Sequence, residues 1–174
     1  MLFFDVVSLF TSIPVDLAIK VATDVLSNDE TLLDRSTIPV DDIVDLLDFC
    51  LSTTNFKCND TYYQQIFGTA MGSPVSAVMA NLVMEDLEKR ALSTSIVQPC
   101  FWKRYVDDMC AAVSFSSVQT LQHHLNNIEP SIQFTVKRET NRFVDFWQDI
   151  ETTSFEIFWS EVRVGLFIYN VISQ

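Results

Sequence analysis

Two adjacent carboxylates, Asp107 and Asp108, stand in the segment FWKRYVDDMCAAV, which is otherwise typical of a buried strand. An isolated buried carboxylate is strongly destabilising, so a chain tolerates one only beside a cation, inside a hydrogen-bond cage or in a turn that returns it to solvent. A tight hairpin turn between WKRY and MCAAV would place both carboxylates at the edge of a sheet. A third carboxylate, Asp5, lies in the apolar run LFFDVVSL.

Divalent metal is the compensating charge that these three carboxylates predict. Converging carboxylates repel one another unless cations neutralise them, and Mg²⁺ prefers hard oxygen ligands that it shares with substrate phosphates. Two such ions about 3.5–4 Å apart can activate a primer hydroxyl and stabilise a leaving pyrophosphate. We therefore expect two Mg²⁺ ions, which Mn²⁺ could replace, at a site built from Asp5, Asp107 and Asp108. Spacing by itself does not establish that the three converge.

Strands and helices in an α+β fold are expected to position these residues. Residues 2–9 predict a short strand that carries Asp5, and the segments NFKC and TYYQQIF predict a hairpin around Asn59 and Asp60. Apolar residues at helical spacing predict three helices, over residues 15–27, 40–51 and 74–91. We expect a mostly antiparallel sheet with these helices on one face.

The third predicted helix has an unusual entrance, FGTAMGSP. Ser73 suits its N-cap and Pro74 its first turn. Gly68 and Gly72 allow backbone conformations that residues with a Cβ resist, which indicates that something approaches this backbone closely. Small side chains predict a face for another backbone or for a nucleotide: Ser76, Ala77, Ala80 and Asn81. For this segment taken alone, a capped core helix is the simpler explanation.

The composition indicates one globular domain with a substantial core, because 48% of the 174 residues are hydrophobic. The formal net charge of -12 argues against a protein that binds a phosphate backbone. Only short clusters of basic residues oppose it: Lys103, Arg104, Lys137, Arg138 and Arg142. No apolar run approaches the length of a membrane span, and no leader is recognisable. We expect an intracellular protein that does not bind membranes.

Three blocks of the sequence follow one another in a recognisable order: FDVVSLFTSIP, GTAMGSPVSAVMANLVME and RYVDD. They resemble the first, second and third palm motifs of the reverse transcriptase of Penelope-like retroelements. The segment NNIEPSIQFTVKRE is similar to the palm segment that follows in that family. The resemblance implies an RNA-directed DNA polymerase palm, which transfers deoxynucleotides from their triphosphates to a DNA primer on an RNA template with two Mg²⁺ ions.

The resemblance also implies roles for individual residues of the first and third motifs. Asp5, together with the backbone carbonyl of Val6, matches the first metal-binding position. Asp107 matches the second metal-binding position, with Asp108 as its acidic neighbour. Phe10 matches the aromatic residue that excludes the 2′-hydroxyl of a ribonucleotide, and a plain core position is its alternative.

Other implied positions concern the nucleotide and the primer. Those of the second motif border the nucleotide and the template: Gln65, Gly68, Met71, Gly72, Ser73 and Pro74. Tyr105 matches a residue near the primer end, and Lys103 and Arg104 before it are candidate primer or template contacts. Lys137 stands where the family offers a cation to the triphosphate. Arg138 fits that role equally well, and a solvated surface is the alternative for both.

The chain also departs from the family pattern. We expect a palm domain over residues 1–174, with a core over 1–145 and a degenerate or incomplete segment over 146–174. A basic fingers region would precede Asp5 and a thumb would follow the palm, and both are expected to be missing or incomplete. The isolated chain is therefore expected to be a weak or inactive enzyme. The alternatives are a catalytically inactive retroelement-derived remnant that acts as a protein-interaction module, and an acidic interaction domain with chance motif matches.

Overall fold

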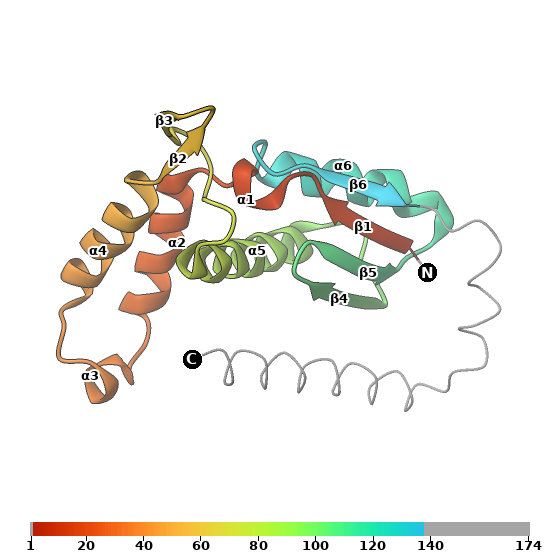
Figure 1. Ribbon diagram of the computed structural model, residues 1–174. Helices are drawn as coiled ribbons and strands as arrows, with labels where there is room; N and C mark the ends of the chain where they lie inside the picture. Colours follow the sequence, from red (N-terminus) through yellow and green to blue (C-terminus); the bar gives the residue numbers. More distant parts are fainter. Residues whose placement is uncertain (1, 138–174) are drawn as a thin grey trace, which may run out of the picture. The chain divides into compact units, whose positions relative to one another are not determined.

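An antiparallel sheet of four strands organises the described part of the chain. The structure, a computed structural model, describes residues 2–137 (Figure 1), which form one compact unit. In sheet order the strands are β4 (Phe101–Tyr105), β5 (Asp108–Ala112), β1 (Leu2–Val6) and β6 (Phe134–Lys137). The predictions for Arg138, for Arg142 and for residues 146–174 lie outside the described residues.

Two helices connect the strands of this sheet. Helix α5, Pro74–Thr94, precedes β4, and helix α6, Val118–Ile128, lies between β5 and β6 along the chain. Taken from β1 onward, the sheet and these two helices follow a β-α-β-β-α-β order, which is the ferredoxin-like arrangement. The predicted α+β class with a mostly antiparallel sheet is confirmed, and within it the longest predicted helix extends three residues beyond residue 91.

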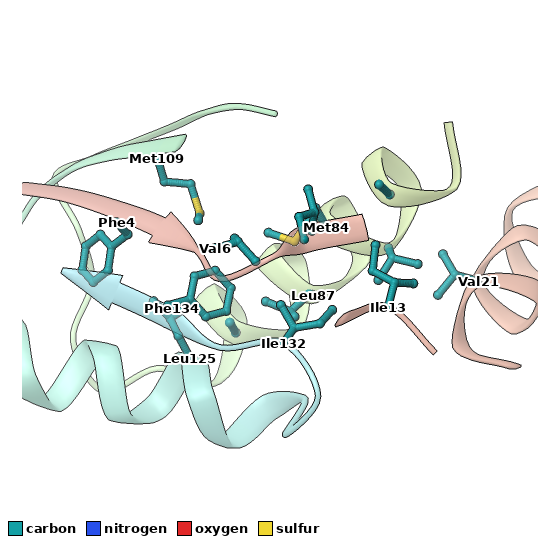
Figure 2. Close-up of a cluster of buried hydrophobic side chains, with 14 of the residues drawn as sticks. Phe4, Val6, Ile13, Val21, Met84, Leu87, Met109, Leu125, Ile132 and Phe134 are labelled. Carbon is teal, nitrogen blue, oxygen red and sulfur yellow. The ribbon is translucent and has the colours of Figure 1, made fainter. Parts of the chain in front are cut away.

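One face of the sheet makes the core, because side chains alternate between the two faces along each strand. In β1, the residues Leu2, Phe4 and Val6 are buried, whereas Phe3 and Asp5 are only partly covered. Figure 2 shows the apolar cluster in which side chains of the sheet meet those of the helices: Phe4, Val6, Met109, Phe134, Met84, Leu87 and Leu125. Asp5 and Asp108, which stand opposite each other on β1 and β5, lie on the other face.

A helical insert separates β1 from α5. Its elements are α1 (Leu9–Ser12), α2 (Val15–Ser27), α3 (Leu32–Arg35), α4 (Val40–Ser52), β2 (Asn55–Cys58) and β3 (Thr61–Gln64). Helix α2 packs against both α4 and α5, and so joins the insert to the core. The helices predicted over residues 15–27 and 40–51 are α2 and α4. Helices α1, α3 and α6 and the short 3-10 helix η1 (Phe115–Ser117) were not predicted.

The predicted strand over residues 2–9 is too long, because the chain turns after Val6. Ser8 adopts a left-handed conformation with φ 51°, and α1 begins at the next residue. The hydroxyl of Thr11 donates to the Ser8 carbonyl at 3.1 Å, and that of Ser12 donates to the Val7 carbonyl at 2.9 Å. Such short-range hydrogen bonds offer the backbone an alternative to strand pairing.

The hairpin predicted from NFKC and TYYQQIF forms, but its second strand ends at Gln64 rather than at Phe67. Beyond that strand end the apolar side chains meet no partner strand, and Ile66 is 93% exposed.

No helix within residues 2–137 is both long and apolar enough to span a membrane.

A candidate carboxylate site at the end of the sheet

Asp5 and Asp108 lie directly opposite each other on the neighbouring strands β1 and β5. Directly opposed residues of an antiparallel pair point to the same face, with Cβ atoms about 4.5–5.5 Å apart. The backbone N–H of Val6 donates to the carbonyl of Asp107 at 3.1 Å, which holds the end of β1 against the turn. The structure therefore brings Asp5, Asp107 and Asp108 to one end of the sheet.

A two-residue turn, Val106 and Asp107, joins β4 to β5, because Tyr105 and Asp108 are the last paired residues. The predicted tight hairpin is thus present, and it leaves both Asp107 and Asp108 exposed. Val106 has φ 55°, a region that a β-branched side chain enters only under constraint. Such a conformation costs about 1–3 kcal/mol and is typical of functional sites, where the surrounding structure maintains it.

The three carboxylates are not arranged as a ready metal-binding group. Within residues 2–137, no group of three or more His, Cys, Asp or Glu side chains is placed so that it could hold a metal ion. Like charges placed opposite each other destabilise a strand pair, and Asp5 is only partly exposed. Val6 is buried beside them, 3% exposed. The backbones of Asp5 and Asp108 are directly opposed, whereas the carboxylate side chains are not gathered as ligands, so the metal site stays a prediction.

The glycine-rich entrance of α5 lies against α1. Gly68 has φ 74°, and a Cβ at this position would lie 2.5 Å from the carbonyl oxygen of Thr11, so only glycine fits without a shift of backbone. The backbone N–H and the hydroxyl of the buried Thr69 both donate to the carbonyl of Phe10, at 2.7 and 3.0 Å. At Gly68, therefore, the close approach expected from the sequence is made by the chain itself.

Gly72 also has a positive φ, of 87°, but it differs from Gly68 because a Cβ at this position would meet no atom within 4 Å. Ser73 takes the N-cap position and Pro74 begins α5 as predicted, but the side chain of Ser73 makes no capping hydrogen bond. Met71 is 69% exposed beside them. The side-chain amide of Gln65 donates to the carbonyl of Phe67 at 2.9 Å, within the loop.

Two further sequence-based expectations concern neighbouring side chains. Phe10 is partly buried and packs against the core, which satisfies the core alternative without excluding contact with a nucleotide. The four small residues of α5 share one broad side of the helix, because i, i+1, i+4 and i+5 are neighbours at about 3.6 residues per turn. Ser76 and Ala80 are buried on this side, whereas Ala77 and Asn81 are exposed. The chain itself therefore covers half of the predicted face.

The basic residues beside the turn have different environments. Lys103 and Tyr105 are exposed, whereas the side chain of Arg104 is only 9% exposed and forms an ion pair with Glu88 of α5 at 2.9 Å. Burial raises the pKa of the Glu88 carboxyl above its ordinary value, and the positive charge of Arg104 opposes that shift. Lys137 ends β6 with its backbone paired to Phe3, and its side chain lies outside the described part of the chain.

The sequence reading missed the ion pair between Glu88 and Arg104 and the buried Thr69. Glu88 follows the buried Leu87 directly, so an acidic residue beside the buried stripe of α5 was the available signal for the pair. For Thr69 no signal of this kind exists, because both of its hydrogen bonds reach a residue far away along the chain.

The chain matches no protein-family model, and no curated protein matches it.

Proposed function

We propose that this chain carries the palm of an RNA-directed DNA polymerase, which adds deoxynucleotides to the 3′ end of a DNA primer on an RNA template. One observation carries the proposal: Asp5 stands opposite Asp108 on neighbouring strands, with Asp107 in the turn between β4 and β5. These are the residues that the palm resemblance assigns to metal binding. The antiparallel sheet with helices packed on its core face supports the same proposal.

The donor chemistry of the site fits Mg²⁺, since carboxylate and carbonyl oxygens are its preferred protein ligands. Asp5, Asp107 and the carbonyl of Val6 would hold it, with Asp108 beside them. When bound, two Mg²⁺ ions supply activation of the primer hydroxyl and charge stabilisation of the leaving pyrophosphate. The carboxylates would turn toward each other on a backbone that already places them side by side, because the bound charge removes their repulsion.

The remaining residues of the proposal bind and orient substrates. The exposed Gly72 and Met71 border open space at the entrance of α5, where a nucleotide and template base could lie. The hydrogen bonds from Thr69 to Phe10 connect this entrance to the residue that is proposed to exclude ribonucleotides. In this proposal Tyr105 and Lys103, both exposed, face the primer strand.

Primer extension tests the proposal directly. The chain, an RNA template, a DNA primer and deoxynucleoside triphosphates are combined with Mg²⁺ or Mn²⁺, and incorporation is measured at high protein concentration. We expect weak incorporation that is lost in Asp5→Ala and retained in Asp45→Ala, a control at an exposed position of α4. Incorporation that survives Asp5→Ala would overturn the proposal. Absence of both incorporation and metal-dependent stabilisation in the wild type would also overturn it.

Sugar selection gives a second measurement on the same assay. If Phe10 lies under the sugar, Phe10→Ala is expected to admit ribonucleotides by removing the clash with the 2′-hydroxyl. Equal exclusion of ribonucleotides by the wild type and by Phe10→Ala would leave Phe10 as a core residue only.

A protein-interaction module without catalysis is the second candidate, and a specific observation favours it. Large apolar side chains are exposed in β3 and in the loop after it, including Tyr62 at 76%, Ile66 at 93% and Phe67 at 56%. Exposed apolar residues that gather in one region are typical of interaction surfaces. Metal-dependent incorporation that requires Asp5 separates the two candidates, because an interaction module has no need of that carboxylate.

A further inference from the structure

The guanidinium of Arg104 connects the carboxylate turn to helix α5. Its Nε donates to Oε1 of Glu88 at 2.9 Å, and its Nη1 donates to Oδ1 of Asn81 at 3.0 Å and to the backbone carbonyl of Val106 at 3.3 Å. Asn81 and Glu88 stand about two helical turns apart, so they lie along one face of α5. One side chain on β4 therefore contacts the helix at two points and the turn at a third.

Each participant in this connection is oriented by its own contacts. The side chain of Arg104 is 9% exposed and that of Glu88 is 15% exposed, so water competes little for the ion pair. The amide nitrogen of Asn81 donates to Oε1 of Glu85 at 2.7 Å, which leaves the amide oxygen directed at Arg104. The planar guanidinium offers several donors in fixed directions, whereas the single ammonium of a lysine cannot reproduce that geometry.

The residue that Arg104 contacts in the turn is the one with the unusual backbone. Val106 has φ 55°, and a conformation of this kind persists only where surrounding contacts over-determine it. The contact from Arg104 to the Val106 carbonyl is one such constraint, and the hydrogen bond from Val6 to the Asp107 carbonyl is another. The turn is thus held by α5 through Arg104 and by β1 through its backbone.

We infer that Arg104 is a positioning residue, which orders the turn of Val106 and Asp107 and thereby holds Asp107 beside Asp5. The effect on metal binding rests on the proposed function, whereas the ordering of the turn does not. Arg104 was expected from the sequence to contact primer or template. Its near-complete burial and its three hydrogen-bond acceptors assign it this structural task instead.

Nuclear magnetic resonance relaxation of the backbone amides tests the ordering. In the wild type, the Val106 and Asp107 amides are expected to have order parameters near 0.85, about that of rigid backbone, and in Arg104→Lys values below about 0.6. The amides of Asn59 and Asp60 in the other hairpin are the internal control. Arg90→Lys is the matched variant, because Arg90 pairs with Asp86 on α5 at a half-exposed position away from the turn.

Mn²⁺ binding, measured by titration, reads the functional consequence separately. We expect the dissociation constant for Mn²⁺ to rise about tenfold or more in Arg104→Lys, as is typical when a residue that orients a ligand is lost, and to stay unchanged in Arg90→Lys. If Arg104→Lys does not fold, Asn81→Ala is expected to give a smaller decrease in order at the same two amides.

The outcomes distinguish the two proposals. Unchanged order parameters at Val106 and Asp107 in Arg104→Lys would overturn the positioning role, whatever the metal titration shows. A decrease in order combined with no Mn²⁺ binding by the wild type would support the positioning role and overturn the proposed function. A decrease in order combined with weaker Mn²⁺ binding supports both.

Discussion

The two hairpins of the described chain use different physical means to make a similar two-residue turn. Between β2 and β3, Asn59 and Asp60 both have positive φ, at 47° and 61°, as a type I′ turn requires. Both residue types tolerate this region well. Between β4 and β5, only Val106 has positive φ, and valine tolerates it poorly.

The two hairpins also differ in how many contacts they make with the rest of the fold. Strands β2 and β3 are exposed along their whole length and form a two-stranded sheet of their own. Strand β5 pairs with β1 as well as with β4, and Arg104 connects the turn to α5. The first hairpin is therefore specified by its turn residues, whereas tertiary contacts maintain the second in a conformation that its own residues disfavour.

Each hairpin also has one ion pair, and removing these pairs should give the largest contrast. Arg104→Met leaves Glu88 almost buried without its partner, and we expect a loss of about 3 kcal/mol in the free energy of unfolding. Lys57→Met breaks the exposed pair with Asp60 and should cost about 0–1 kcal/mol. Chemical denaturation of both variants measures the difference. Equal losses would show that the second hairpin does not depend on its contact with α5.

Metal binding should separate the acidic residues of the two turns. Mg²⁺ or Mn²⁺ at a hundredfold excess over its dissociation constant should stabilise the folded wild type by about 2.7 kcal/mol. Asp107→Asn is expected to abolish this stabilisation, whereas Asp60→Asn at the equivalent turn position should keep it. Thermal unfolding across a metal titration gives the result. A melting temperature of the wild type that does not respond to millimolar metal would argue against a convergent site.

Exchanging the turn residues should have a smaller effect, with opposite signs in the two hairpins. Val106→Asn places a residue that tolerates positive φ at the strained position, and we expect a gain of about 1 kcal/mol in the free energy of unfolding. Asn59→Val introduces the same strain into the first hairpin and should cost about 1 kcal/mol. Destabilisation by Val106→Asn would mean that packing of the valine side chain, which is 44% exposed, stabilises the folded state by more than the strained backbone destabilises it.

The pH dependence of stability should give the smallest contrast. Burial raises the pKa of Glu88 above its ordinary 4.5, so at a pH between the unfolded and the folded pKa this carboxyl binds more protons in the folded chain than in the unfolded chain. Stability from this group is complete below the unfolded pKa and is lost as the pH rises through the folded pKa.

The Glu88 contribution can be isolated by comparing variants. As the pH rises from below 4.5 toward neutrality, the free energy of unfolding of the wild type should decrease relative to that of Glu88→Gln. Denaturant titrations at several pH values measure this difference, with Asp60→Asn as the control from the exposed pair. A difference between wild type and Glu88→Gln that does not change with pH would contradict the assignment.

Much of this fold could be predicted from local pattern, and the exceptions have physical causes. The helices α2 and α4 and the start of α5 follow from apolar spacing and from prolines at their first turns or just before them. The early end of β1 was missed because it depends on the hydroxyls of Thr11 and Ser12, which bond to backbone carbonyls in the turn. The spacing of hydrophobic residues along the sequence does not predict such a hydrogen bond.

The candidate site divides in the same way between local and distant causes. The sequence by itself determined that Asp107 would lie in a tight turn and that Asp5 would lie in a strand, because both depend on residues a few positions away. Only the tertiary structure decided that Asp5 stands opposite Asp108 and that Gly68 lies against the backbone of Thr11. It also decided that the guanidinium of Arg104 is hydrogen-bonded to side chains of α5. Strand register and side-chain partners depend on surfaces from distant parts of the chain, and a local pattern of residues does not encode which surfaces will meet.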